Sequence, residues 1–133
     1  MSQENVEIVR RAGETWNESG TAVFAQKFLT DDVLYEDDPS WPDRQTAHGK
    51  EEVIQRFEVF FEVWGDWDAT IERVVDSGDD RVVSTFTLRT TGSTSGATQE
   101  YTWGYVFELR DGLIWHFRAY LDPTEALATI GAE

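Results

Sequence analysis

A tight turn at Asp111 and Gly112 divides residues 101–121 into two runs of alternating apolar residues. An Asp-Gly pair in this position is the strongest short-range signal for a β-hairpin that a sequence carries. Counting outward from the turn gives four opposite pairs, which are Leu109 with Ile114, Phe107 with His116, Tyr105 with Arg118, and Trp103 with Tyr120. The fold must therefore be built around a long antiparallel hairpin.

The two faces of this hairpin differ in character. Side chains directly opposite in an antiparallel pair share a face, so one face combines aromatic rings with a histidine, an arginine and two phenols. Such a mixture is typical of the lining of a small-molecule pocket. The other face is apolar and also needs cover, because it carries Val106, Trp115, Phe117, Ala119 and Leu121. We expect helices on the first face and a partner subunit on the second.

Helical periodicity comes first along the chain and strand periodicity comes last. Apolar spacing predicts a helix that Ser2 caps, a short amphipathic helix that ends at Thr30, and a long helix over residues 49–65. Alternation predicts strands at residues 33–36, 67–75, 81–91, 99–110 and 113–121, and Pro123 begins a short last helix. Residues 40–48 are expected to form an irregular loop. This order predicts a single α+β domain over residues 1–133, with a curved antiparallel sheet over helices.

Composition disfavours several classes of function. A formal charge of −15 argues against nucleic acids and anionic membranes as partners, because a polyanion would be repelled. The chain has no cysteine and two histidines, so it predicts no disulfide and no protein-built metal site. Its first residues lack the apolar run of a signal peptide, and no segment is long enough to span a bilayer. We therefore expect a cytoplasmic protein.

Four motifs carry a resemblance over nearly the whole chain. They are residues 28–33 (Phe-Leu-Thr-Asp-Asp-Val), 36–39 (Glu-Asp-Asp-Pro), 49–53 (Gly-Lys-Glu-Glu-Val), and 110–114 (Arg-Asp-Gly-Leu-Ile) running on to Leu121-Asp122-Pro123. In this order the sequence resembles the SnoaL-like branch of the nuclear transport factor 2-like superfamily, which is related to ketosteroid isomerase. The resemblance implies a cone whose sheet wraps around the long helix, with a pocket at the wide end. It also implies a homodimer through the sheet face assigned to Trp115 and Phe117.

The resemblance directs attention to the acids before Pro39. In ketosteroid isomerase, an aspartate just before a proline in this segment is the general base. That enzyme is a standard example of how a protein tunes the pKa of a carboxylate. Alternation from Val33 turns Asp37 inward, whereas the position before proline favours Asp38, so both remain candidates. A carboxylate inside an aromatic pocket would have a raised pKa and would suit a base. Alternatively, Asp-Asp-Pro is a solvated turn.

The isomerase also needs donors for the developing enolate oxygen. By the resemblance, the tyrosine of its first helix falls at Ala12 here, so that donor is missing. Its second donor falls at or near Tyr105, whose phenol can donate a hydrogen bond to a carbonyl oxygen. If the site is catalytic, Asp37 or Asp38 is expected to point into the cavity within reach of Tyr105, Arg118 or His116.

Arg118 and His116 are the charged candidates of the hairpin. A buried arginine needs a partner, so Arg118 is expected beside Asp37, Asp38 or a ligand carboxylate. Superfamily epoxide hydrolases use an Asp-Arg-Asp arrangement, for which Asp122 could supply the third residue, although it is better placed to cap the last helix. His116 titrates near neutral pH, yet it could equally be satisfied by a tyrosine or by backbone.

Two functions follow from these residues. The first is a cofactor-independent isomerase, cyclase or lyase that moves a proton on a small hydrophobic or carbonyl-bearing molecule, with epoxide hydrolysis as a variant. The second is a non-catalytic binder that uses the same pocket. In both, the expected pocket wall comprises Trp16, Trp41, His48, Phe57, Phe61, Trp103, Phe107 and Tyr120. For His48, the alternative is a place at the start of the long helix.

Overall fold

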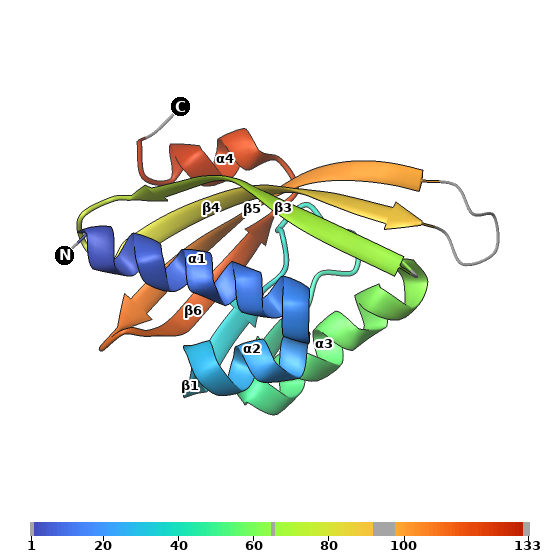
Figure 1. Cartoon of the computed structure of the whole chain (residues 1–133), viewed down its shortest axis with the longest axis horizontal. Helices are drawn as coiled ribbons and strands as arrows, with labels where there is room; N and C mark the ends of the chain where they lie inside the picture. The colour runs from blue at the N-terminus through green and yellow to red at the C-terminus, as the bar shows by residue number, and fades with distance from the viewer. Residues whose placement is uncertain (1, 65, 92–97, 132–133) are drawn as a thin grey trace.

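The computed structural model describes residues 2–64, 66–91 and 98–131, without the side chains of residues 2, 61, 63 and 64 (Figure 1). Within these ranges the chain forms four helices and six strands. The helices are α1 (Ser2–Ser19), α2 (Thr21–Phe28), α3 (Gly49–Trp64) and α4 (Pro123–Ala128). The strands are β1 (Leu29–Glu36), β2 (Thr46–His48), β3 (Asp66–Asp76), β4 (Arg81–Thr91), β5 (Thr98–Arg110) and β6 (Leu113–Tyr120).

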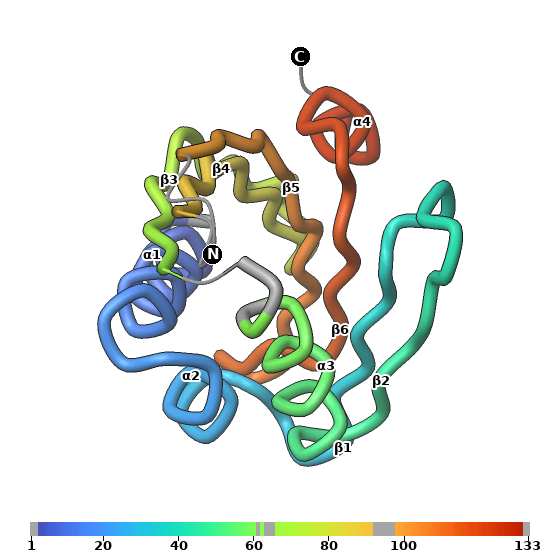
Figure 2. Tube along the Cα trace, turned by 90° about the vertical axis from the view of Figure 1, so that its right-hand side faces the viewer, coloured from blue at the N-terminus to red at the C-terminus, as the bar shows by residue number. Residues whose placement is uncertain are grey.

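The strands form one sheet in the order β2-β1-β6-β5-β4-β3. β1 runs parallel to β6, and the other neighbouring strands are antiparallel. Figure 2 shows the sheet curling around α3, with α1 and α2 on the same concave side and α4 on the outer side. The expected α+β cone, with its curved sheet wrapped around the long helix, is therefore confirmed.

The first strand is longer than its apolar pattern indicated. β1 begins at Leu29, directly after α2, because Leu29 is fully buried and pairs with Ile114 of β6. Thr30 therefore lies within a strand and does not end the preceding helix as expected. Part of the expected irregular loop is also ordered, since Thr46–His48 forms β2 against the end of β1.

The register of the β5–β6 hairpin differs from the regular pairing that we predicted. Leu109 pairs with Ile114 as expected, but Glu108 pairs with His116 and Phe107 with Phe117. The register shifts between Glu108 and Leu109, so Trp115 is an extra residue on β6, which is a β-bulge. Because side chains alternate along a strand, one extra residue moves every later side chain of β6 to the opposite face.

The bulge reverses the predicted faces of β6 beyond Ile114. Phe117 and Ala119 point into the core with exposed fractions of 0% and 1%, whereas they were expected on the partner-facing side. His116, Arg118 and Tyr120 lie on the outer face, whereas they were expected in the pocket. The prediction that His116, Arg118 and Tyr120 share the pocket face with the aromatic rings of β5 is therefore wrong.

Helix α4 covers part of the outer face of the sheet. Ala126 and Leu127 pack against Val83 of β4 and Val106 of β5. Contact is close at Gly104, where a Cβ atom would lie 2.8 Å from the Cβ of Ala126. Part of the cover that we expected from a partner subunit is thus supplied by the chain itself.

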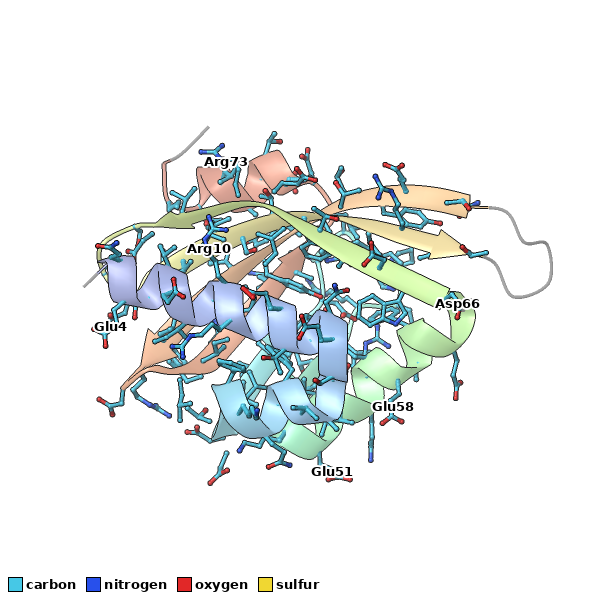
Figure 3. The ribbon with its side chains drawn as sticks, in the orientation of Figure 1. Glu4, Arg10, Glu51, Glu58, Asp66 and Arg73 are labelled. Atoms are coloured by element: carbon cyan, nitrogen blue, oxygen red, sulfur yellow. The ribbon has the colours of Figure 1, made fainter. Side chains whose placement is uncertain are left out.

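Acidic side chains gather on the solvent sides of the helices. Figure 3 shows Glu51 and Glu58 of α3 pointing away from the sheet. α3 can present acids outward because its buried residues, such as Val53 and Phe57, recur at helical spacing on the other side. Among the described helices, none is long and apolar enough to cross a membrane.

Candidate functional site

An aromatic cavity lies between α1 and the inner face of the sheet. Its walls include Trp16 of α1, Phe57 of α3, and Trp103, Tyr105 and Phe107 of β5, all of which were predicted near the pocket. The volume of the cavity is about 70 Å³, well below the roughly 300–1,000 Å³ of drug-sized ligand sites. In this conformation the cavity therefore suits a very small molecule.

The lining of the aromatic cavity carries no charge among the residues that the structure describes. Its polar groups come from Asn17, Ser84, Tyr105 and the indoles of three tryptophans, Trp16, Trp67 and Trp103. The indole of Trp16 donates to the hydroxyl of Thr21 at 2.9 Å, which fixes its ring. An uncharged wall favours an uncharged ligand, because an isolated ion would lose its hydration without gaining a partner.

Tyr105 is a deeply buried hydroxyl of this cavity. Its ring lies 5.4 Å from that of Phe86 and 5.8 Å from that of Trp16, and 5% of the residue is exposed. Burial, and secondarily the negative charge of Asp37, raise the pKa of Tyr105 well above its usual value. Tyr105 therefore stays protonated at neutral pH and can donate a hydrogen bond to a ligand oxygen.

A buried polar cluster adjoins Tyr105, formed by Tyr35, Asp37 and Arg56. Oδ2 of Asp37 accepts from Nη2 of Arg56 at 2.5 Å and from the backbone N–H of Gln45 at 2.9 Å. Burial raises the pKa of Tyr35 well above its usual value, and so do the nearby Tyr105 and a hydrogen bond to Asp37. The cluster thus links the charge of Asp37 to the wall of the aromatic cavity.

The two aspartates before Pro39 have different surroundings. Asp37 continues the inward alternation of Val33 and Tyr35, as the strand pattern predicted. Asp38 turns to the other side, where Oδ1 accepts from the backbone N–H and hydroxyl of Ser40, both at 2.7 Å. Oδ2 of Asp38 accepts from the backbone N–H of Leu121, also at 2.7 Å.

These contacts decide between the alternatives left open for the two acids. Asp37 and Asp38 are 5% and 4% exposed, so the interpretation as a turn with both acids in solvent is wrong. Burial alone would raise the pKa of Asp38, but hydrogen bonds from Ser40 and Leu121 and the charge of Arg118 outweigh it and lower that pKa. Asp38 therefore ties the β1–β2 connection to β6. Asp37 is the acid coupled to Tyr105, although it does not line the aromatic cavity itself.

His116 takes part in a charged network on the outer face of the sheet. Its Nδ1 lies 2.6 Å from Oε2 of Glu108, and its Nε2 lies 2.7 Å from Oε2 of Glu36. Glu108 also pairs with Arg81 at 3.4 Å. This network connects β1, β4, β5 and β6 away from the aromatic cavity. Across the described residues, no group of three or more acidic or histidine side chains is placed to hold a metal ion.

Arg118 and Asp122 do not assemble around the aromatic cavity. The guanidinium carbon of Arg118 lies 5.9 Å from the centre of the Tyr120 ring, on the outer side near Asp38. Oδ1 of Asp122 accepts from the backbone N–H of Thr124 at 2.9 Å, so Asp122 caps α4. Asp122 therefore has the capping role that we favoured, and none of the three residues of the expected Asp-Arg-Asp arrangement lines the aromatic cavity.

Three other expected wall residues lie elsewhere or outside the described part. Trp41 packs edge-on against Phe60 at 6.2 Å. His48 is exposed, and its backbone N–H donates to Oε1 of Glu52 at 2.9 Å, which is the helix-start role that we gave as the alternative. The side chain of Phe61 lies outside the described part of the structure.

Arg56 is the charged residue of this site that the sequence interpretation missed; Tyr35 and the lining residues Asn17, Trp67, Ser84 and Phe86 were not predicted for the pocket either. Arg56 lies three residues after Val53 and four before Phe60, so it shares the apolar stripe of α3. Its side chain is 13% exposed and its guanidinium lies 4.6 Å from the centre of the Phe60 ring. A charge inside an apolar stripe implies a buried partner, and this signal could have identified the pair with Asp37.

Comparisons with known proteins agree with the observed fold. The model of a family described as SnoaL-like domain matches residues 9–117. A protein assigned as a SnoaL-like polyketide cyclase from Jannaschia sp. CCS1 is 23% identical, with a TM-score of 0.78 over 99% of this chain and 94% of that one. An NTF2-like protein of unknown function from Burkholderia pseudomallei K96243 is 21% identical, with a TM-score of 0.76 over 97% and 98%.

A third solved structure has a ligand in its description. This protein from Catenulispora acidiphila DSM 44928, with a ketosteroid isomerase-like fold and in complex with trimethylamine, is 16% identical. Its TM-score is 0.73, and the match covers 96% of this chain and 94% of that one. At these identities the structures establish a shared fold. Among curated proteins, none matches the sequence.

Proposed function

This chain belongs to the SnoaL-like domain family, and we propose that it binds a small, uncharged, largely apolar molecule in the aromatic cavity. The observation that carries the proposal is the lining of that cavity, which is aromatic and free of charged side chains among the described residues. A ligand with one carbonyl or hydroxyl oxygen fits best, because Tyr105 supplies a buried donor.

The size of the aromatic cavity limits the ligand. At about 70 Å³ it favours a molecule of one small ring over a steroid-sized one. Replacing Ala12, which lines the cavity and is 1% exposed, by leucine would fill part of this space. The matched control is Ala22→Leu, which adds the same volume at an exposed position of α2.

Isothermal titration with cyclohex-2-enone, a neutral one-ring ketone, tests this proposal. Binding is expected for the unchanged protein and for Ala22→Leu, and Ala12→Leu is expected to weaken it at least tenfold. Tyr105→Phe is expected to weaken it by about 2- to 10-fold, which corresponds to one neutral hydrogen bond. Equal affinity of Ala12→Leu and Ala22→Leu would place the ligand elsewhere and would contradict the proposal.

A second candidate function is proton transfer next to a ligand carbonyl. It is favoured by one observation, the burial of Asp37 beside the wall of the aromatic cavity, where its negative charge contributes to the raised pKa of Tyr105. We propose Asp37 as the general base and Tyr105 as the donor to the carbonyl oxygen, with no role for His116 or Arg118. The pair with Arg56 would have to loosen for Asp37 to accept a proton.

Incorporation of deuterium into cyclohex-2-enone in D₂O, followed by NMR, separates the catalyst from the binder. A catalyst is expected to lose about 10²- to 10⁴-fold in rate on Asp37→Asn. Exchange no faster than in buffer, together with saturable binding, would leave the non-catalytic binder as the function.

We also propose a homodimer through the outer face of the sheet near Trp115. The apolar surface that the outer face leaves for a partner is smaller than expected, because Phe117 belongs to the core and α4 covers Val106. Light scattering of the purified protein is expected to give twice the 15.2 kDa mass of the chain. A mass of one chain would remove the dimer from the account.

A further inference from the structure

A second cleft lies beside the connection between β1 and β2, next to Arg118 on the outer face of β6. It is lined by Glu36, Asp37, Arg44, Gln45, Thr46 and Arg118. Figure 2 shows the β1–β2 connection standing beside β6, on the side away from β5. The cleft has a volume of about 580 Å³, which falls within the range of small-molecule sites. We call it the polar cleft.

Both acids of the polar cleft are already engaged. Asp37 is paired with Arg56 at 2.5 Å, and Glu36 contacts the imidazole of His116 at 2.7 Å. These partners lie outside the lining of the polar cleft. Both acids of the polar cleft therefore already have hydrogen-bonded partners behind it.

The two arginines of the polar cleft have no such partner. Within the described part of the chain, neither Arg44 nor Arg118 has a carboxylate within 4.0 Å of its guanidinium. Arg118 also has a buried Nε without a hydrogen-bond partner among the described residues. The burial of this guanidinium is therefore incompletely compensated by the chain itself, so an acceptor that reaches its terminal nitrogens from the cleft would be stabilised.

Arg118 is held in a defined position. Its guanidinium lies against the ring of Tyr120 at 5.9 Å, and the charge of Asp38 attracts it from the β1–β2 connection. The planar guanidinium matches the two oxygens of a carboxylate, with parallel N–H donors. In a chain with a formal charge of −15, two arginines in one cleft without a described carboxylate within 4.0 Å are a local exception that favours an anion.

We propose that the polar cleft binds the carboxylate of a small organic acid, with Arg118 as the principal ligand and Arg44 as the second cation. Glu36, Gln45 and Thr46 form the polar surroundings of the bound acid. The lining of the polar cleft shares no residue with that of the aromatic cavity, although Asp37 belongs to the polar cleft and its charge also acts on Tyr105. Binding of an acid in the polar cleft does not require the function proposed for the aromatic cavity. The protein would then bind a neutral molecule inside the cone and an acid outside it.

Titration of the isotope-labelled protein with succinate tests the site, and uncharged succinamide is the matched ligand control. At constant ionic strength near 0.1 M, long-range repulsion by the acidic surface is largely screened. Succinate is expected to shift the backbone amides of Gln45, Thr46 and Arg118, and succinamide is expected to leave them in place. Arg118→Gln should weaken succinate binding at least tenfold, and Arg44→Gln about threefold.

Arg11→Gln is the control variant, because it removes the same charge from an exposed position of α1. It is expected to change the affinity for succinate less than twofold. Equal losses for Arg11→Gln and Arg118→Gln would mean non-specific attraction, and unchanged binding on Arg118→Gln would mean another location. Either outcome overturns the proposal. A third outcome would also overturn the proposal: the unchanged protein does not bind succinate, and Arg118→Gln lowers the molecular mass in solution. That result would assign Arg118 to a subunit interface.

Discussion

Removing the guanidinium of Arg56 tests the buried cluster beneath the aromatic cavity. The side chains of Arg56 and Asp37 are 13% and 4% exposed, so Arg56→Met would leave a buried carboxylate without its cation. Loss of one partner of a buried ion pair costs about 3–5 kcal/mol. Asp37 keeps the hydrogen bond from the backbone of Gln45, so we expect the lower end, about 3 kcal/mol.

Urea unfolding measures this loss. With a slope of about 2 kcal/mol/M, a loss of about 3 kcal/mol lowers the midpoint by roughly 1.5 M. The control is Arg89→Met, because the pair of Arg89 with Glu100 is exposed at 55% and 59%. Such a surface pair is worth about 0–1 kcal/mol, so the control midpoint should move little.

A double variant separates the ion pair from the packing of Arg56. Arg56→Met combined with Asp37→Asn removes both charges, and we expect it to be more stable than Arg56→Met alone by at least about 1 kcal/mol. If Arg56→Met costs no more than Arg89→Met, the pair is not buried as described. Additive losses in the double variant would mean that the charges of Arg56 and Asp37 do not interact, which would contradict the buried ion pair.

Two further predictions concern Asp38 and the bulge. Asp38 has a folded-state pKa below its ordinary 3.8, so its charge stabilises the fold above that pH, and this contribution is lost as the pH falls through the folded value. Urea unfolding measures the difference in stability between the unchanged protein and Asp38→Asn. This difference should therefore shrink as the pH falls from 7 to 3, and a constant difference would contradict the lowered pKa. Phe117→Ala should cost about 3–5 kcal/mol of stability because Phe117 is fully buried. Trp115 is half-buried, so Trp115→Ala should cost clearly less. Equal losses of stability in thermal unfolding would contradict the bulge.

Much of the fold could be predicted because local chemistry agrees with the global arrangement. Asp111 and Gly112 both have positive φ angles, 55° and 81°, as an Asp-Gly hairpin turn requires. The alternation of Val33 and Tyr35 placed Asp37 inside correctly. These features depend on neighbouring residues, so they can be derived from a short segment of sequence.

The faces of β6 could not be predicted in the same way. In a regular register Trp115 and Phe117 would lie on the same face of the strand, and both are aromatic. The local pattern therefore gives no sign that Phe117 turns to the opposite face. The bulge is favoured by packing against distant elements. The centre of the Phe117 ring lies 6.2 Å from that of Phe24 of α2 and 4.8 Å from that of Tyr35 of β1. A single inserted residue then moves His116 and Arg118 from the expected pocket to the outer face.

The most direct test of the account uses the indole N–H signals of the chain's six tryptophans during a titration with cyclohex-2-enone. Trp16, Trp67 and Trp103 line the aromatic cavity, whereas Trp41 and Trp115 do not. We expect saturable shifts for the first three signals and none for Trp41 and Trp115. Saturable shifts confined to Trp41 or Trp115 would contradict ligand binding in the aromatic cavity.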